Sequence, residues 1–179
     1  MNKTYKADVR RFLDSQDLHY QMRGDTFILP YNEDGDQWVT VINVDNTQDA
    51  ICVYSKSSNN NIPPERLSAV CEFITRANFG FQIGNWELDI ADGECRFKTS
   101  VDAEGDDNVP NLLKQLLRRN LSGFRRYLPG IRRVVNGGNP KECCDQCERV
   151  DPNGAAVREA LETLLRVRAA REGINRMFL

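Results

Sequence analysis

The residues best suited to chemistry are arginines that occur as pairs every seven residues: Arg118, Arg119, Arg125, Arg126, Arg132 and Arg133. On an α-helix, a step of seven residues advances about 10 Å and returns to nearly the same face, with a drift of about 20°. Guanidinium groups at this spacing could contact acidic side chains or successive phosphates. The pairs therefore predict a basic, partner-binding face on one helix over residues 110–135.

Three interpretations of this basic face remain open. The arginines could be solvated or paired with carboxylates of their own chain, as many surface charges are. They could bind an acidic protein partner, or they could contact the phosphates of a nucleic acid with a strong dependence on salt. Base stacking is not indicated, because the aromatic residues nearby, Phe124 and Tyr127, fit the apolar side of the helix.

Cys143, Cys144 and Cys147 form a second group that could do chemistry, because helical spacing would gather their thiols on one side. Metal binding, a redox pair of Cys144 and Cys147, and unreactive thiols are the alternatives. A structural zinc site needs four ligands, and neither a second CxxC motif nor a pair of histidines accompanies this cluster. The sequence therefore predicts no cofactor, and the three cysteines are weak candidates for metal ligands.

No arrangement of residues typical of catalysis is visible. His19 is the only histidine, and it lies far in sequence from any Ser or Cys in a recognisable nucleophile motif. The glycines at predicted strand ends do not form a phosphate-binding loop. The sequence therefore predicts that the protein is not an enzyme, and it assigns no catalytic residue.

The net charge of −2 hides an uneven distribution of charge along the chain. Residues 1–109 hold 10 Lys and Arg against 19 Asp and Glu, whereas residues 110–179 hold 14 against 7. The two parts could attract each other in the folded state, or the second part could leave a basic surface for an acidic partner. Because no apolar run is long enough to span a bilayer, we expect a soluble, cytoplasmic protein with no membrane partner.

Hydrophobic periodicity predicts the elements that would position these residues. Strands are predicted over residues 20–31, 38–44, 50–55, 81–90 and 95–101, with a bulge or break in the fourth at Gly84 and Asn85. Helices are predicted over residues 4–18, 63–80 and 110–135, and Pro129 and Gly130 are expected to kink or break the last. Since the strands come in hairpin-linked groups, this order predicts an α+β domain with an antiparallel sheet of about five strands flanked by helices.

The remainder of the chain is predicted to lie outside this domain. Residues 137–151 read as a linker that carries the cysteine cluster, and residues 152–179 read as a C-terminal helical extension. The extension has an apolar side made of Val157, Ala160, Leu161, Leu164 and Val167. This surplus apolar helix surface needs a cover from its own domain or from a second copy, and it therefore favours a homodimer.

Several short motifs stand out along the predicted domain: IPPER (62–66), EFITRANFG (72–80), WELD (86–89), ECRFKTS (94–100) and RYLPGI (126–131). Together they resemble the YbjN family, a family described as bacterial sensory transduction regulators. The resemblance covers roughly residues 4–136, and we treat 1–136 as a YbjN-like domain. It implies a type III secretion chaperone-like fold, an antiparallel sheet flanked by helices, and it carries no catalytic motif.

These observations predict a non-enzymatic protein-binding module, chaperone-like or regulatory, that acts as a homodimer. The alternative is a nucleic-acid-binding regulator that uses the arginine-rich helix 110–135. Binding to nucleic acid is possible but not favoured by the sequence. The protein partner is not identified by any motif.

Overall fold

The computed structural model describes residues 5–33, 36–58, 61–106 and 108–149. In these residues it shows one antiparallel sheet of six strands, in the spatial order β1-β2-β3-β4-β6-β5, together with four α-helices. The strands are β1 (Gln21–Arg23), β2 (Thr26–Glu33), β3 (Asp36–Asp45), β4 (Ala50–Ser57), β5 (Asn85–Leu88) and β6 (Cys95–Asp102). The helices are α1 (Tyr5–Ser15), α2 (Leu67–Phe79), α3 (Val109–Val135) and α4 (Pro140–Arg149). The predicted α+β class, with an antiparallel sheet flanked by helices, is confirmed.

Glycines account for the differences between the predicted and observed strands. Gly24 has a φ of +59°, and it helps to form a two-residue turn that divides the predicted first strand into β1 and β2. Strand β5 begins only after Gly84, whose φ is +92°. A Cβ atom at Gly84 would lie 2.9 Å from the carbonyl oxygen of Lys98. The predicted break at Gly84 is thus confirmed, but the strand is shorter than predicted.

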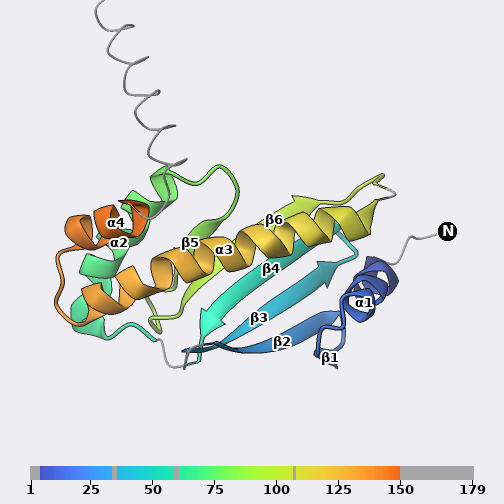
Figure 1. Ribbon diagram of the computed structural model, residues 1–179, viewed down its shortest axis with the longest axis horizontal. Helices are drawn as coiled ribbons and strands as arrows, with labels where there is room; N and C mark the ends of the chain where they lie inside the picture. The colour runs from blue at the N-terminus through green and yellow to red at the C-terminus, as the bar shows by residue number, and fades with distance from the viewer. Residues whose placement is uncertain (1–4, 34–35, 59–60, 107, 150–179) are drawn as a thin grey trace, which may run out of the picture.

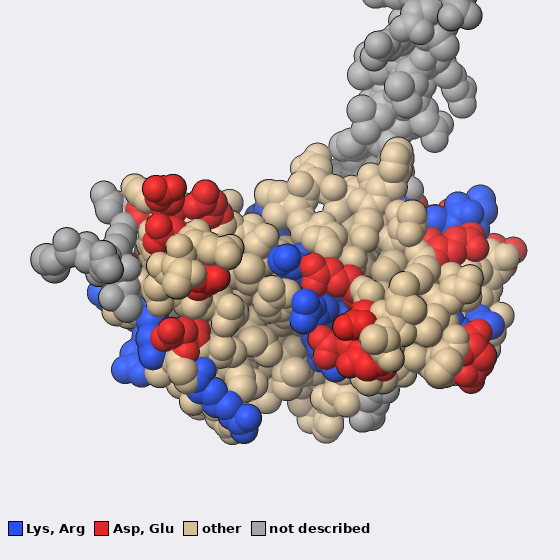
Figure 2. Space-filling model, turned by 180° about the vertical axis from the view of Figure 1, so that it is seen from behind, with Lys and Arg blue, Asp and Glu red and all other residues tan. Residues whose placement is uncertain are grey.

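The sheet has one covered face and one open face. Helix α3 crosses the covered face, α1 packs beside its N-terminal half, and α2 and α4 pack against its C-terminal half (Figure 1). Side chains of β3 from Trp38 to Val44 alternate between buried and half-exposed positions, and β4 shows the same alternation. Figure 2 shows the molecule from behind, with a cluster of charged side chains near the middle of that view.

Two clusters of buried side chains lie beneath α3. The aliphatic cluster joins the N-terminal half of α3 to α1 and to strands β2 to β4: it includes Val9, Leu13, Phe27, Leu29, Ile42, Ile51, Val53, Leu113 and Leu117. The aromatic cluster joins the C-terminal half of α3 to α2, α4, β5 and β6: it includes Trp38, Phe73, Trp86, Cys95, Phe97, Phe124, Tyr127, Cys143, Cys144 and Cys147. Helix α3 is therefore the element that both clusters share.

Helix α3 continues through Pro129, so the prediction of a break at Pro129 and Gly130 is wrong. Pro129 is exposed, whereas Leu128 and Ile131 on either side are buried in the aromatic cluster. A proline inside a helix costs about 3 kcal/mol. Burial of the flanking turns offsets this cost, and the third arginine pair stays on the same helix as the first two.

The prediction of a linker over residues 137–151 is wrong for Pro140–Arg149, which form α4. Asn139 accepts a hydrogen bond from the backbone N–H of Glu142 at 3.1 Å, and Pro140 occupies the first helical position. Cys143, Cys144 and Cys147 are buried on the inner side of α4, because cysteine behaves as a small apolar residue. The predicted extension over 152–179 lies outside the described residues.

Within the described ranges, no helix combines the length and the apolar character that crossing a bilayer would require.

Candidate partner-binding surface

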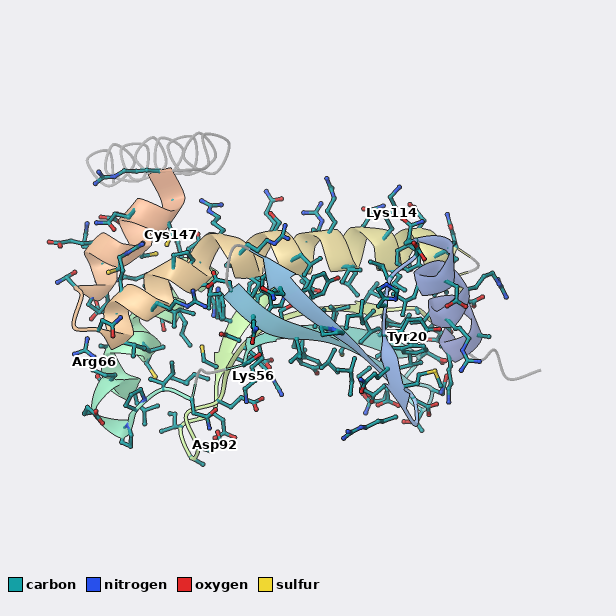
Figure 3. All side chains as sticks on the ribbon, turned by 60° about the horizontal axis from the view of Figure 1, so that its bottom comes forward. Tyr20, Lys56, Arg66, Asp92, Lys114 and Cys147 are labelled. Atoms are coloured by element: carbon teal, nitrogen blue, oxygen red, sulfur yellow. The ribbon has the colours of Figure 1, made fainter. Side chains whose placement is uncertain are left out.

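The outer side of α3 carries a row of exposed cations. Arg118, Arg119, Arg125 and Arg133 are exposed, and Lys114 is exposed one turn before the first pair. Lys114 points away from the sheet (Figure 3). We call these five residues the α3 basic face. The remaining two arginines of the predicted set, Arg126 and Arg132, are half-buried.

Arg126 contacts the end of α4. Its Nε donates a hydrogen bond to the carbonyl oxygen of Cys147 at 3.1 Å, and its Nη2 donates one to the carbonyl oxygen of Glu148 at 3.4 Å. The last carbonyl groups of a helix lack partners inside the helix and carry partial negative charge. A cation that satisfies them stabilises both the helix end and its attachment to α3. Arg126 therefore has a structural role.

The third arginine pair is also engaged by the chain itself. Arg132 forms an ion pair with Asp36 at the start of β3. Arg133 Nη2 lies 3.5 Å from the Sγ of Cys147, although much of the side chain is exposed. This pair thus links the C-terminal turn of α3 to β3 and to α4.

Arg125 lies over an aromatic ring of the sheet. Its Cζ is 5.4 Å from the centre of the Trp38 ring, and Trp38 stacks on Tyr31 with 5.2 Å between ring centres. A guanidinium group at this distance is attracted by the face of the indole. Burial raises the pKa of the Tyr31 phenol, and the charge of Arg125 opposes that rise.

Arg118 and Arg119 differ from these residues. Both are exposed, and among the residues that the structure describes neither makes a hydrogen bond or an ion pair. The first pair therefore presents two adjacent guanidinium groups to solvent in the middle of the helix. Chemically, such a pair suits a carboxylate or phosphate group of a partner.

The three cysteines of α4 are not arranged as a metal centre. No set of three or more His, Cys, Asp or Glu side chains suited to holding an ion occurs in the described part of the chain. Burial raises the pKa of the Cys147 thiol, and the charge of Arg133 opposes this effect. Because burial favours the neutral thiol, the surroundings of Cys147 do not activate it as a nucleophile.

A buried polar network between α3 and the sheet was not predicted. Asn120 accepts a hydrogen bond from Ser55 Oγ at 2.6 Å and donates to the carbonyl oxygen of Val53 at 2.8 Å. Ser55 Oγ lies 2.8 Å from Thr40 Oγ1. The signal was present in the sequence, because Asn120 is seven residues from the buried Leu113 and Tyr127. This network fixes the position of α3 on the sheet.

The open face of the sheet carries a second group that was not predicted. Arg96 lies 4.5 Å from the centre of the Tyr54 ring and forms ion pairs with Glu87 at 2.9 Å and Glu94 at 3.2 Å. Lys56 also contacts Glu94, at 2.6 Å. Burial, together with a hydrogen bond to Cys52, raises the pKa of Tyr54 to about 12. Because these charges compensate one another, they form a weaker candidate for binding than Arg118 and Arg119.

The fold and this surface define an α+β protein with a basic helix across its sheet. No family model matches the chain, and no curated protein matches it. Among solved structures, one chain of the HopA1–SchA chaperone-effector complex is similar to 72% of this chain over 92% of its own length, with 18% sequence identity and a TM-score of 0.41. At that identity and TM-score, the similarity supports no conclusion about family or function. Membership of the YbjN family and the type III secretion chaperone-like fold stay predictions.

Proposed function

We propose that the protein is a non-enzymatic protein-binding module, chaperone-like or regulatory, that binds an acidic surface of a partner protein through the α3 basic face. The observation that carries this proposal is the contrast within the arginine repeat. Arg118 and Arg119 are exposed and have no ionic partner in the described residues, whereas Arg126 and Arg132 are held by their own chain. Two cations left together in this way favour association with negative charge.

An acidic protein is favoured over a nucleic acid by the position of the aromatic residues. Phe124 and Tyr127 are buried, so α3 offers no ring on which an unpaired base could stack. From Lys114 to Arg133 the α3 basic face spans about 29 Å at 1.5 Å per residue. It holds fewer cations than the 6–10 phosphate contacts that typically give strong binding to DNA. Nucleic-acid binding is therefore an outcome to be tested, and it ranks second.

We infer further that the module acts as a homodimer. The open face of the sheet presents the half-exposed apolar side chains of Ile28, Val39 and Val41, and a second copy could cover them. Light scattering at high protein concentration tests this inference. A strict monomer would contradict it and would leave the proposal for the α3 basic face untouched.

The test of the main proposal compares three probes at low salt: a fluorescent polyglutamate peptide, mixed-sequence DNA and mixed-sequence RNA. Fluorescence anisotropy is measured for the wild type and for a variant that combines Arg118→Glu with Arg119→Glu. We expect the wild type to bind the acidic peptide and the variant to bind it at least about tenfold more weakly, with a strong salt dependence for the wild type.

The matched control combines Arg11→Glu with Arg23→Glu, because both arginines are exposed and lie outside α3. It makes the same change in net charge but leaves the α3 basic face intact. The control should therefore retain binding. If DNA or RNA binds more tightly than the peptide and the Arg118/Arg119 variant loses that binding, the nucleic-acid function is correct. If the wild type binds none of the three probes, the α3 basic face is not a binding site for acidic groups.

A further inference from the structure

Two exposed apolar side chains lie four residues apart in the chain, at the end of α2 and in the loop that follows it. Phe79, the last residue of α2, is 87% exposed, and Ile83, in the loop that leads to β5, is 44% exposed. In the described residues, the other exposed large apolar side chain is Ile90 at 67%, which follows β5 at the opposite end of that strand. We call Phe79 and Ile83 the α2-end patch. An exposed apolar surface that another segment covers would lose its contact with water, which favours association.

The end of α4 lies close to this patch. The Tyr127 hydroxyl is 3.5 Å from Glu148 Oε1, and the centre of the Tyr127 ring is 5.1 Å from that of Phe81. Phe81 lies between Phe79 and Ile83 in the chain. Arg126 holds the carbonyl oxygens of Cys147 and Glu148. The last described turn of α4 is therefore fixed beside the loop that carries the patch.

Thirty residues follow Arg149, and their sequence has an apolar side that matches this patch. Residues 150–156 can span about 23 Å if extended, which is enough to reach the loop from the end of α4. From Val157 onward, apolar residues recur at helical spacing: Val157, Ala160, Leu161 and Leu164. Such a stripe needs a cover, and the α2-end patch offers exposed apolar side chains on the same side of the molecule as the end of α4.

We propose that residues 152–179 dock on Phe79 and Ile83 of their own chain through this apolar stripe. The occupant is the chain's own segment because the connection is short. A tether of a few residues gives an effective concentration in the millimolar range, well above the concentration of a second copy in dilute solution. The docked segment would cover apolar surface at the end of α2 and leave the α3 basic face free.

Photo-crosslinking in the full chain tests this proposal. Phe79→p-benzoylphenylalanine places the photoreactive group at the patch, and Ile90→p-benzoylphenylalanine is the control at another exposed apolar site, which is 67% exposed. Unlabelled and ¹⁵N-labelled protein are mixed in equal amounts before irradiation, and crosslinked peptides are identified by mass spectrometry. A crosslink within one chain contains one isotope, whereas a crosslink between two chains also gives mixed pairs.

We expect crosslinks from position 79 to residues 157–168, free of mixed pairs and at least about fivefold more abundant than from position 90. Combining Leu161→Asp with Leu164→Asp should lower the yield about tenfold, because it places charge in the apolar stripe. Combining Arg158→Asp with Arg166→Asp, on the other sides of the helix, should leave the yield unchanged. Mixed pairs would contradict docking in cis and would show that the segment docks on a second copy. Equal yields from positions 79 and 90, an absence of crosslinks to the segment, or an unchanged yield in the Leu161/Leu164 variant would overturn the proposal.

Discussion

The two halves of α3 obey the same seven-residue repeat but have different surroundings. The N-terminal half packs on the aliphatic cluster with α1, and the elements beside it leave its outer side open. The C-terminal half packs on the aromatic cluster and is flanked by α2 and α4 (Figure 1). As a result, Arg118 and Arg119 face solvent, whereas Arg126 and Arg132 contact α4 and Asp36. A repeat in sequence is therefore not a repeat in structural surroundings.

The buried side of α3 shows the same contrast. Leu116, Gly123 and Gly130 occupy equivalent positions, seven residues apart. A Cβ atom at Gly123 would lie 2.6 Å from Phe97 Cζ, and one at Gly130 would lie 2.5 Å from Phe73 Cζ. The C-terminal half of α3 thus uses glycine where large rings approach the helix closely. The N-terminal half uses leucine at the same position, because its neighbours are aliphatic.

The largest predicted effect comes from the aromatic cluster. Phe124 lies between Trp38 and Trp86, with ring centres 5.8 and 5.6 Å away. Phe124→Ala should lower the free energy of unfolding by about 3–5 kcal/mol, because it opens a cavity between rigid rings. Urea denaturation measures this loss. Leu113→Ala in the aliphatic cluster is the comparison, with an expected loss of about 2–5 kcal/mol. A loss below about 1 kcal/mol for Phe124→Ala would show that this cluster collapses around the cavity.

Asn120 lies at the junction of the two halves and should give the next largest effect. Asn120→Ala removes the partner of Ser55 and of the Val53 carbonyl group, which are buried. We expect a loss of about 2–3 kcal/mol in the free energy of unfolding. A double-mutant cycle with Ser55→Ala should give a coupling energy of about 1 kcal/mol. Additive losses would show that the two side chains act independently.

Much of the fold follows from local sequence patterns. Alternation predicted the positions of β3, β4 and β6, and helical spacing predicted α2 and α3. The pairing of β4 with β6 was not predictable in this way, because α2 and β5 separate the two strands in the chain. The contact of Arg96 with the Tyr54 ring and the ion pair of Lys56 with Glu94 depend on that strand arrangement. They were missed for this reason.

The candidate surface was predicted only in part, and the reason is again long-range contact. Spacing placed all six arginines along one helix, which the structure confirms as α3. Whether each arginine is exposed depends on α4, and the cysteines of α4 were interpreted as a group that does chemistry instead of as its buried side. Binding of a partner by these arginines stays a prediction. The Asn139–Pro140 start of α4 was a usable local signal.

Alkaline pH should lower the free energy of unfolding through the aromatic cluster, which contains Cys95, and not through the aliphatic cluster. Burial raises the pKa of Cys95 from 9.0 to about 12, so the folded state favours the neutral thiol. The stability that the buried neutral thiol contributes is complete below the pKa of Cys95 in the unfolded chain, and it is lost as pH rises toward 12. Between about pH 8.5 and 10.5, we expect the loss from Cys95 to be about 2 kcal/mol in the free energy of unfolding.

Chemical denaturation at several pH values, with wild type and Cys95→Ala, measures this effect. The Cys95→Ala variant should be less stable than the wild type at neutral pH, but its free energy of unfolding should fall less as pH rises. Val44→Ala, in the aliphatic cluster, is the control. Its loss of stability relative to the wild type should be similar at the lowest and the highest pH. If Cys95→Ala and the wild type lose stability equally between about pH 8.5 and 10.5, ionisation of Cys95 has no part in the alkaline weakening.

The smallest predicted effect tests the contrast between the arginines most directly. Arg126→Ala removes two hydrogen bonds to the end of α4 and should lower the free energy of unfolding by about 1 kcal/mol. Arg119→Ala, exposed on the same helix, should change it by less than about 0.5 kcal/mol. Thermal unfolding of both variants checks the difference. Equal losses would mean that the contacts of Arg126 with α4 add nothing to stability. The two halves of the arginine repeat would then differ in geometry alone, and the structural argument for assigning partner binding to Arg118 and Arg119 would fail.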